Sequence, residues 1–249
     1  MLLKNRIALI TGSSRGIGAS TAKLFAQHGA SVAVNYNKSE DAAIRVVEEI
    51  VSKGGKAIAI KADVTDFNEV KNMVDRVTSE FGFIDTLIIN ASMHFKYAQF
   101  LEQEWEDIEN KIVGEVKSFF NPCKIILPSM IEKRKGCIIS VSSGLSKKPG
   151  GGFIAHSAAK AALNMMSSSL SHEVGQYGIR VNAIAPGLTL TDATSGQPEE
   201  RRRKSAETNP MKRIGQPDDL AGAILLLASD YAGYITGGYI PVDGGTTIL

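Results

Sequence analysis

The sequence has 249 residues, 43% of them hydrophobic and 22% charged, so it can bury the core of one large α/β domain without disulfides or metals. Its formal net charge of +2 predicts no nucleic-acid partner and no membrane surface as a partner. The two cysteines, Cys123 and Cys137, lack metal-ligand spacing and fit a reduced compartment, so we expect a cytoplasmic protein without a metal site.

Short apolar runs alternate with longer amphipathic stretches along almost the whole chain. The runs expected to form strands are, in chain order, "RIALIT", "SVAVNY", "KAIAI", "DTLIIN", "GCIISVSS", "IRVNAIAP" and "YIPVDG". Helices are expected at "ASTAKLFAQHGA", at 39–53, near 67–81, at about 102–131, from "AHSAAK" to about 178, and at 217–229. This alternation predicts an α/β fold of the Rossmann type, in which a doubly wound parallel sheet lies between helices in three α/β/α layers. We expect residues 1–249 to form a single domain.

One segment, at about 188–214, shows neither the apolar alternation of a strand nor the apolar periodicity of an amphipathic helix. Irregular segments of this length inside a compact domain are typically lids or binding loops, so we expect a lid here. Its "EERRRK" run is most simply a solvated helix face, with an anionic partner as the alternative.

A glycine-rich loop, "TGSSRGIG" at 11–18, follows the first strand and begins the first helix. Gly12 permits a tight turn, Gly16 lets a pyrophosphate approach the backbone, and Gly18 allows close packing of helix and strand. The loop therefore predicts a dinucleotide site at a helix N-terminus, although the same glycines could serve the fold alone.

The residues at the end of the second strand indicate which dinucleotide would bind. An NAD site usually has an acidic residue there, whereas this chain has Asn35, Asn37 and Lys38. With Arg15 in the loop, this pattern favours the 2′-phosphate of NADP. Asp63 is expected at the end of the next strand, near an adenine.

Several further motifs make the whole chain similar to the short-chain dehydrogenase/reductase family, especially to its 3-oxoacyl-carrier-protein reductase branch. These are "NAS", "ISVSS", "HSAAKAAL", "VNAIAPG" and "YITGGYIPVDGG", together with the glycine-rich loop. The resemblance implies the Rossmann-type fold, a homotetramer or homodimer, and a nucleotide site. It places that site at Gly12, Ser14, Arg15, Gly16, Ile17, Gly18, Asn37, Asp63, Asn90, Lys160, Pro186 and Gly187.

The family's catalytic set is Asn, Ser, Tyr and Lys, and this chain departs from it at two positions. Ser143 and Lys160 match the serine and the lysine, but His156 occupies the tyrosine position and Glu115 the asparagine position. The tyrosine donates a proton to the carbonyl oxygen, and loss of such a donor costs on the order of 10²–10⁴ in rate.

Without the family pattern, Ser143, His156 and Glu115 are the components of a nucleophilic hydrolase: a serine, a base and a carboxylate that orients the base. Lys160 would favour neutral His156, as a general base requires. The leading hypothesis is therefore a serine-type esterase or thioesterase that needs no cofactor. Its expected substrate is an ester, such as a methyl ester, of an acyl chain tethered to an acyl carrier protein in polyketide or fatty-acid assembly.

Two other functions remain open. One is an NADPH-dependent 3-oxoacyl-carrier-protein reductase in which His156 replaces the tyrosine, with Tyr97 as another donor to examine. The other is a pseudoenzyme that binds a cofactor or a partner. His94 is a weaker candidate base, and Lys133 and Arg134 could contact an acidic carrier.

Overall fold

Seven parallel strands form the centre of the computed structural model, which describes residues 1–196 and 198–247. Their order in the sheet is β3-β2-β1-β4-β5-β6-β7, so β1 lies between β2 and β4. Because the chain order reverses there, the ligands of doubly wound sheets bind beyond the carboxyl ends of the strands that correspond to β1 and β4. The strands are β1 (Ile7–Ile10), β2 (Ser31–Tyr36), β3 (Lys56–Lys61), β4 (Thr86–Ile89), β5 (Gly136–Val141), β6 (Ile179–Pro186) and β7 (Tyr239–Val242).

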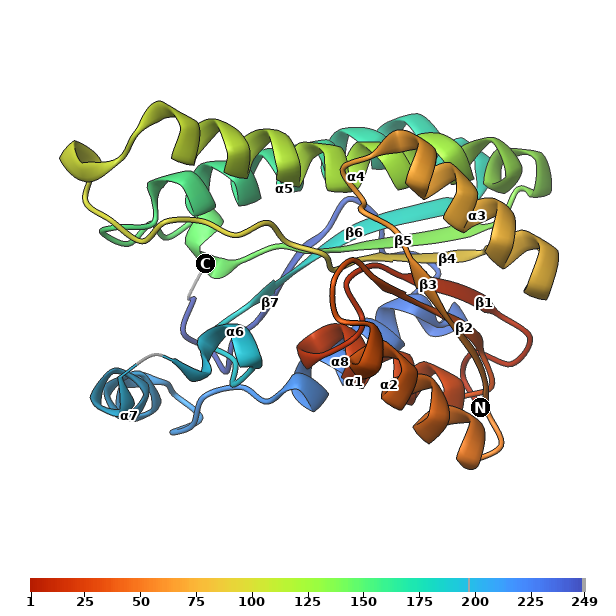
Figure 1. Cartoon of the computed structure of the whole chain (residues 1–249), viewed down its shortest axis with the longest axis horizontal. Helices are drawn as coiled ribbons and strands as arrows, with labels where there is room; N and C mark the ends of the chain where they lie inside the picture. Colours follow the sequence, from red (N-terminus) through yellow and green to blue (C-terminus); the bar gives the residue numbers. More distant parts are fainter. Residues whose placement is uncertain (197, 248–249) are drawn as a thin grey trace.

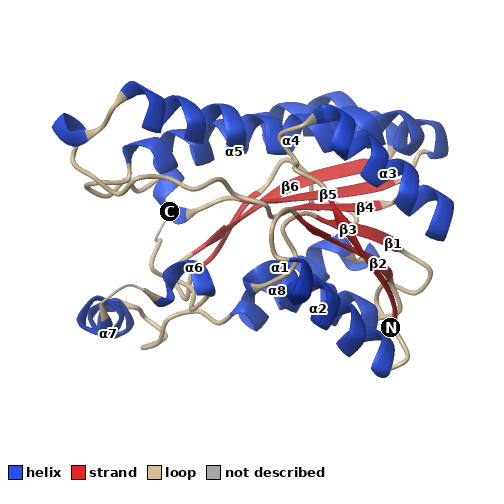
Figure 2. Cartoon of the chain, viewed as in Figure 1, coloured by secondary structure: helices blue, strands red, loops and turns tan. Residues whose placement is uncertain are grey.

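Helices cover both faces of this sheet (Figure 1, Figure 2). One face carries α1 (Gly16–Gln27), α2 (Glu40–Ser52) and α8 (Pro217–Ala228), and the other carries α3 (Phe67–Phe81), α4 (Trp105–Lys133) and α5 (Ile154–Val174). Two hydrophobic clusters fill the space between the sheet and its two helical layers. The predicted three-layer, doubly wound parallel sheet is thus confirmed.

Local sequence explains how these elements form. Every residue of β4 and β5 is buried, as expected for central parallel strands covered on both faces. Before α3, the side chain of Asp66 accepts hydrogen bonds from the backbone N–H groups of Asn68 and Glu69, which satisfies amides that have no partner inside the helix.

The structure changes two of the predicted boundaries. The helix expected to run to about residue 178 ends at Val174 and is followed by a 3-10 turn at Gly175–Tyr177. The segment at 188–214 is also not wholly irregular, because it contains α6 (Asp192–Ser195) and α7 (Glu199–Thr208). Gln197, between these helices, lies outside the described residues. None of the described helices is long and apolar enough to cross a membrane.

Candidate active site

The glycine-rich loop is held between β1, β2 and β4 by close backbone contacts. Gly12 has a φ of 60°, and a Cβ there would lie 2.8 Å from the Cα of Ala91. At Gly18, a Cβ would lie 2.6 Å from the amide nitrogen of Asn90. That nitrogen donates to the carbonyl of Gly12 at 2.9 Å, and Asn35 Oδ1 accepts from the Gly12 N–H at 3.0 Å. Gly18 therefore permits the close packing that the sequence predicts.

The start of α1 fits a dinucleotide phosphate. Arg15 precedes the helix without making a side-chain cap, and no acidic residue lies in the first turn. The helix N-terminus therefore presents uncapped N–H groups and partial positive charge beyond the end of β1. Ser14 lies in the loop before Arg15 and Ile17 in the first turn of α1, so the residues that the family resemblance implies adjoin this helix start and suit a dinucleotide.

The ribose side of this site is polar and carries positive charge from Arg15 and Lys38. Asn37 donates to Asp63 Oδ2 at 3.0 Å, and Thr65 donates its backbone N–H to Asp63 Oδ1 at 2.9 Å. Burial raises the pKa of Asp63, but the hydrogen bonds from Thr65 and Asn37 outweigh burial and leave the pKa lowered. An ionised Asp63 thus fixes Asn37 at the end of β2.

The segment at about 188–214, which the sequence predicts to be a lid, approaches the same loop. A Cβ at Gly16 would lie 3.5 Å from the Cβ of Thr191, just before α6, and Arg15 Nε lies 4.0 Å from the Asp192 carboxylate. Pro186 ends β6, and the N–H of Gly187 donates to the carbonyl of Val242 at 3.2 Å, which holds the beginning of that segment beside β7.

Three elements, β5, α4 and α5, hold the four residues of the catalytic positions. Ser143 follows β5, Glu115 lies on α4, and His156 and Lys160 lie one helical turn apart on α5. Glu115 and Lys160 are almost fully buried, with 1% and 3% exposure. Charges buried to this extent require partners.

The carboxylate of Glu115 joins two buried lysines. Its Oε1 accepts from Lys160 Nζ, and its Oε2 accepts from Lys111 Nζ at 2.7 Å. Ser92 Oγ and the Met93 N–H donate to the same Oε2, each at 3.2 Å. Burial raises the pKa of Glu115, but Lys160 and Lys111 outweigh it and lower the pKa to about 2. Two ammonium groups and one carboxylate leave the cluster with one excess positive charge.

His156 lies beside this cluster under the ring of Phe95, with ring centroids 4.7 Å apart. Its Nδ1 is buried and has no hydrogen-bond partner. Burial, with the charges of Lys160 and Lys111, lowers the pKa of His156 to about 3, against the opposing effect of Glu115. Burial is the largest of these causes, and the charge of Lys160 acts in the same direction.

The hydrogen-bonded triad predicted from sequence is not assembled. Within residues 1–196 and 198–247, no hydrogen bond joins His156 to Ser143 or to Glu115. Glu115 is committed to the lysines, and Ser143 Oγ accepts the N–H of Leu145 at 3.2 Å. The reason is electrostatic, because ammonium groups are stronger partners for a buried carboxylate than a neutral imidazole is.

The remaining candidates lie farther from this cluster. Tyr97 packs its ring on Phe153, with centroids 4.9 Å apart, and His94 is exposed. The residue that sequence reasoning missed is Lys111, which is fully buried. Its position four residues before Glu115 on a predicted helix was the available signal, because residues at i and i+4 share a helix face.

A glycine-rich loop at the switch point of a doubly wound sheet is the arrangement of nucleotide-binding α/β proteins, and comparison with known proteins identifies the family. Residues 12–247 match the family model described as "Enoyl-(Acyl carrier protein) reductase". A 3-oxoacyl-acyl-carrier-protein reductase of Staphylococcus epidermidis is 40% identical over 243 residues, which cover 97% of this chain and 98% of the relative. A reductase of the same description from Thermotoga maritima is 36% identical over 248 residues and is covered completely, as is this chain.

Solved structures agree with these relatives. A 7α-hydroxysteroid dehydrogenase complexed with NADH and 7-oxo glycochenodeoxycholic acid is 34% identical, with a TM-score of 0.93 over 98% of this chain and 94% of that one. A mutant short-chain dehydrogenase/reductase of Serratia marcescens is 30% identical, with a TM-score of 0.92 over 100% of both chains. The chain belongs to the short-chain dehydrogenase/reductase family of oxidoreductases and resembles 3-oxoacyl-acyl-carrier-protein reductases.

Proposed function

We propose that this protein is an NADP(H)-dependent reductase of 3-oxoacyl thioesters in which neutral His156 takes the place of the family tyrosine. The observation that carries the proposal is the place of His156 at the family's tyrosine position, one helical turn before Lys160 and beside the buried cluster of Lys111, Glu115 and Lys160. Burial first, and the two lysines second, lower the pKa of His156 and keep its imidazole uncharged. The relatives' names support a carrier-protein-linked 3-oxoacyl substrate.

Bound NADPH would supply the hydride, held by the amides at the start of α1 and by the polar end of β2. Arg15 and Lys38 suit its 2′-phosphate, because a phosphate carries negative charge that an NAD ribose lacks. Asn37, Asp63 and Asn90 line the same edge of the sheet, and Lys160 lies beyond the end of β5.

His156 would act on the ketone oxygen by hydrogen bonding. A buried acceptor without a partner is tolerated better than a buried N–H without one, so the tautomer with its proton on Nε2 is favoured. The Nε2–H then donates to the carbonyl oxygen, as other neutral histidines with lowered pKa values polarise carbonyls. The Ser143 hydroxyl is a second donor.

The cluster of Lys111, Glu115 and Lys160 would stabilise the charge that develops on that oxygen. Its excess positive charge is fixed before reaction in a buried setting, where electrostatic stabilisation is strongest. The ketone gains a hydride and one proton to become an alcohol. Since a neutral imidazole is a very weak acid, the proton would come from solvent.

Hydrolysis by Ser143 receives less support, because a serine needs a hydrogen-bonded base to become a nucleophile. His156 is neutral, as a general base must be in order to accept a proton, but no described contact connects it to Ser143. An acyl carrier protein remains the proposed partner of the reductase, with Lys133 and Arg134 as exposed cations for an acidic surface.

The test is to follow NADPH oxidation with acetoacetyl-coenzyme A in the wild type and in His156→Phe, His156→Tyr and Ser143→Ala. We expect the wild type to form the 3-hydroxyacyl product. Loss of one preorganised donor in His156→Phe should lower kcat/KM by about 10²-fold, while His156→Tyr restores a donor and retains reduction.

A parallel assay with a carrier-linked methyl ester separates the other hypotheses. Ester cleavage that is lost in Ser143→Ala, without NADPH oxidation, would identify a hydrolase. Reduction seen only in His156→Tyr would identify a degenerate site, and either result contradicts the proposal.

A further inference from the structure

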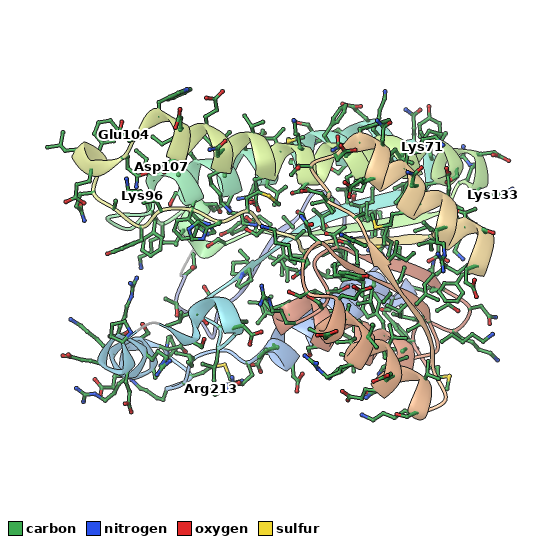
Figure 3. The ribbon with its side chains drawn as sticks, viewed as in Figure 1. Lys71, Lys96, Glu104, Asp107, Lys133 and Arg213 are labelled. Carbon is green, nitrogen blue, oxygen red and sulfur yellow. The ribbon has the colours of Figure 1, made fainter. Side chains whose placement is uncertain are left out.

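A second cavity lies at the amino ends of the strands, away from the candidate active site. It has a volume of about 670 Å³, and its charged and aromatic lining consists of Arg6, Arg134, Lys135, Arg180, Asp230 and Tyr234. Arg6 precedes β1, Lys135 precedes β5, and Arg180 lies at the start of β6. Figure 3 shows the nearby Lys133 at one end of the molecule, with Lys96, Glu104 and Asp107 at the other.

The lining carries more positive than negative charge. Arg6 pairs with Asp230 and lies 3.7 Å from Asp85, and Lys135 lies 3.6 Å from the same Asp85. Four basic side chains therefore face two carboxylates, and Arg134 and Arg180 have no carboxylate partner among the described residues.

Arg180 is the most informative of these cations. Its Nη2 donates to Cys137 Sγ at 3.4 Å and to the carbonyl of Ser229 at 3.2 Å, while its Nη1 is buried without a partner. Neutral groups, and no carboxylate among the described residues, therefore hold the guanidinium of Arg180 at the cavity wall.

The dipole of α4 does not account for this charge. Cations favour the C-terminus of a helix, which explains Arg134 at the end of α4. Arg180 donates to the carbonyl of Ser229, the C-cap residue of α8, so a second helix end compensates part of its charge. Two helix ends and two carboxylates thus face four basic side chains, and the remaining positive charge suits a ligand with negative charge of its own.

We propose that this cavity is a second ligand site, for a small molecule that carries a phosphate monoester. Arg134 and Lys135 are exposed at the cavity and can contact the phosphate oxygens. One N–H of the Arg134 guanidinium donates to the carbonyl of Gln176 at 2.8 Å, which fixes the group at the end of α4 and leaves its other N–H groups for a phosphate. The volume exceeds the need of a bare phosphate ion and lies in the range of small-molecule sites. The cavity contains none of the residues proposed for reduction, and it shares only Arg134 with the surface proposed for a carrier protein.

Calorimetric titration of the full chain with inorganic phosphate and with glycerol phosphate tests this inference. We expect saturable binding by the wild type and at least about a tenfold rise in Kd in the double variant Arg134→Gln/Lys135→Gln, because two charged contacts are lost. Both side chains are exposed, so the variant should fold, and circular dichroism checks that it does. Tighter binding of glycerol phosphate would show recognition of the organic part, whereas equal binding would show a site for phosphate alone.

Two controls locate the binding. Lys133→Gln removes a neighbouring exposed cation that does not line the cavity, and it should leave the Kd unchanged. Arg15→Gln removes a cation from the dinucleotide loop and should also have no effect. The proposal is overturned by absence of saturable binding, by an unchanged Kd in the double variant, or by loss of binding in Arg15→Gln.

Discussion

His156 differs from a tyrosine in the proton that it can give. A phenol ionises near pH 10 and can act as an acid when a nearby ammonium lowers its pKa. An imidazole whose pKa lies at about 3 is uncharged near neutrality, and its remaining N–H is far less acidic. Lys160 therefore changes its effect with its neighbour: beside a phenol it promotes proton loss, and beside His156 it prevents proton gain.

This environment predicts that the His156 ring does not titrate between about pH 5 and 8, where an ordinary histidine does. Proton NMR of the ring signals across this range measures the titration, with His156→Asn to assign the resonance among the four histidines. Lys111→Met removes one of the repelling cations and should raise the pKa of His156. A His156 midpoint near 6.5 in the wild type would contradict this account.

The same shift makes stability depend on pH. The pKa of His156 falls from 6.5 when unfolded to about 3 when folded, so the unfolded chain binds the extra proton between these values. Stability is therefore lost as the pH falls from about 6.5 toward 3. Chemical denaturation over this window should show a smaller pH dependence in His156→Asn than in the wild type.

Glu115 allows a further prediction at the scale of single residues. Glu115→Gln leaves two buried ammonium groups without their carboxylate, and removal of one partner from a buried ion pair costs about 3–5 kcal/mol of the free energy of unfolding. Urea denaturation measures this loss. The stabilising ionisation of Glu115, whose pKa is lowered to about 2, is lost as the pH falls below its ordinary 4.5.

Glu49 provides a matched control, because it also joins two lysines, Lys23 and Lys53, and its pKa is also lowered to about 2. Its side chain is 39% exposed, however, so water screens the charges and Glu49→Gln should cost no more than about 1 kcal/mol. Equal losses in the two variants would show that burial does not determine the energy of the Glu115 cluster.

The sequence predicted that Ser143, His156, Glu115 and Lys160 belong to one site. It did not predict which of these residues contact one another. Spacing along a helix shows which residues share a face, whereas the choice of partner for a carboxylate depends on competing charges in three dimensions. Lys111 donates to Glu115 Oε2 at 2.7 Å, and this hydrogen bond takes the place of one from His156. The triad hypothesis left this lysine out.

At the scale of elements, the regular strands and helices follow from apolar periodicity, which burial against a central sheet imposes. α7, "EERRRKSAET", contains no buried residue and so has no apolar stripe; only its charged run, interpreted as a solvated helix face, indicated a helix there. The position of α6 beside Gly16 was absent from the sequence pattern, because it depends on a contact between residues far apart in the chain.

The end of β2 and the start of α1 together predict a preference for NADPH over NADH. Arg15→Ala and Lys38→Ala should each weaken NADPH binding by about tenfold, the equivalent of one charge-assisted hydrogen bond at a partly exposed site. NADH binding should stay unchanged because it lacks the 2′-phosphate. Fluorescence titration measures both affinities, and Lys56→Ala, at the opposite end of β3, is the control. Equal losses for NADH and NADPH would place the two cations elsewhere on the cofactor.

At the scale of the whole molecule, the sheet separates two regions of positive charge. The carboxyl ends of the strands hold the dinucleotide loop and the Lys111–Glu115–Lys160 cluster, and the amino ends hold the cavity with Arg134 and Arg180. The net charge of +2 conceals this distribution, because many exposed ion pairs cancel in the total. Composition therefore excluded a strongly basic surface without excluding local anion sites.

The outer surface of α4 and α5 carries apolar side chains and predicts self-association. Val113 and Phe120 are 43% and 49% exposed and lie seven residues apart on α4, and Met165 on the adjacent α5 is 67% exposed. We expect a homodimer or homotetramer joined through these helices. Phe120→Lys combined with Met165→Lys should shift it toward the monomer, because association would then bury charge.

Light scattering after size-exclusion chromatography measures the mass of each variant. Val51→Lys is the matched control, since Val51 is 53% exposed on α2, which covers the opposite face of the sheet (Figure 1). If the α4–α5 surface forms the interface, the control keeps the wild-type mass while the double variant loses it. A monomeric wild type, or the same loss in both variants, would exclude this surface as the interface.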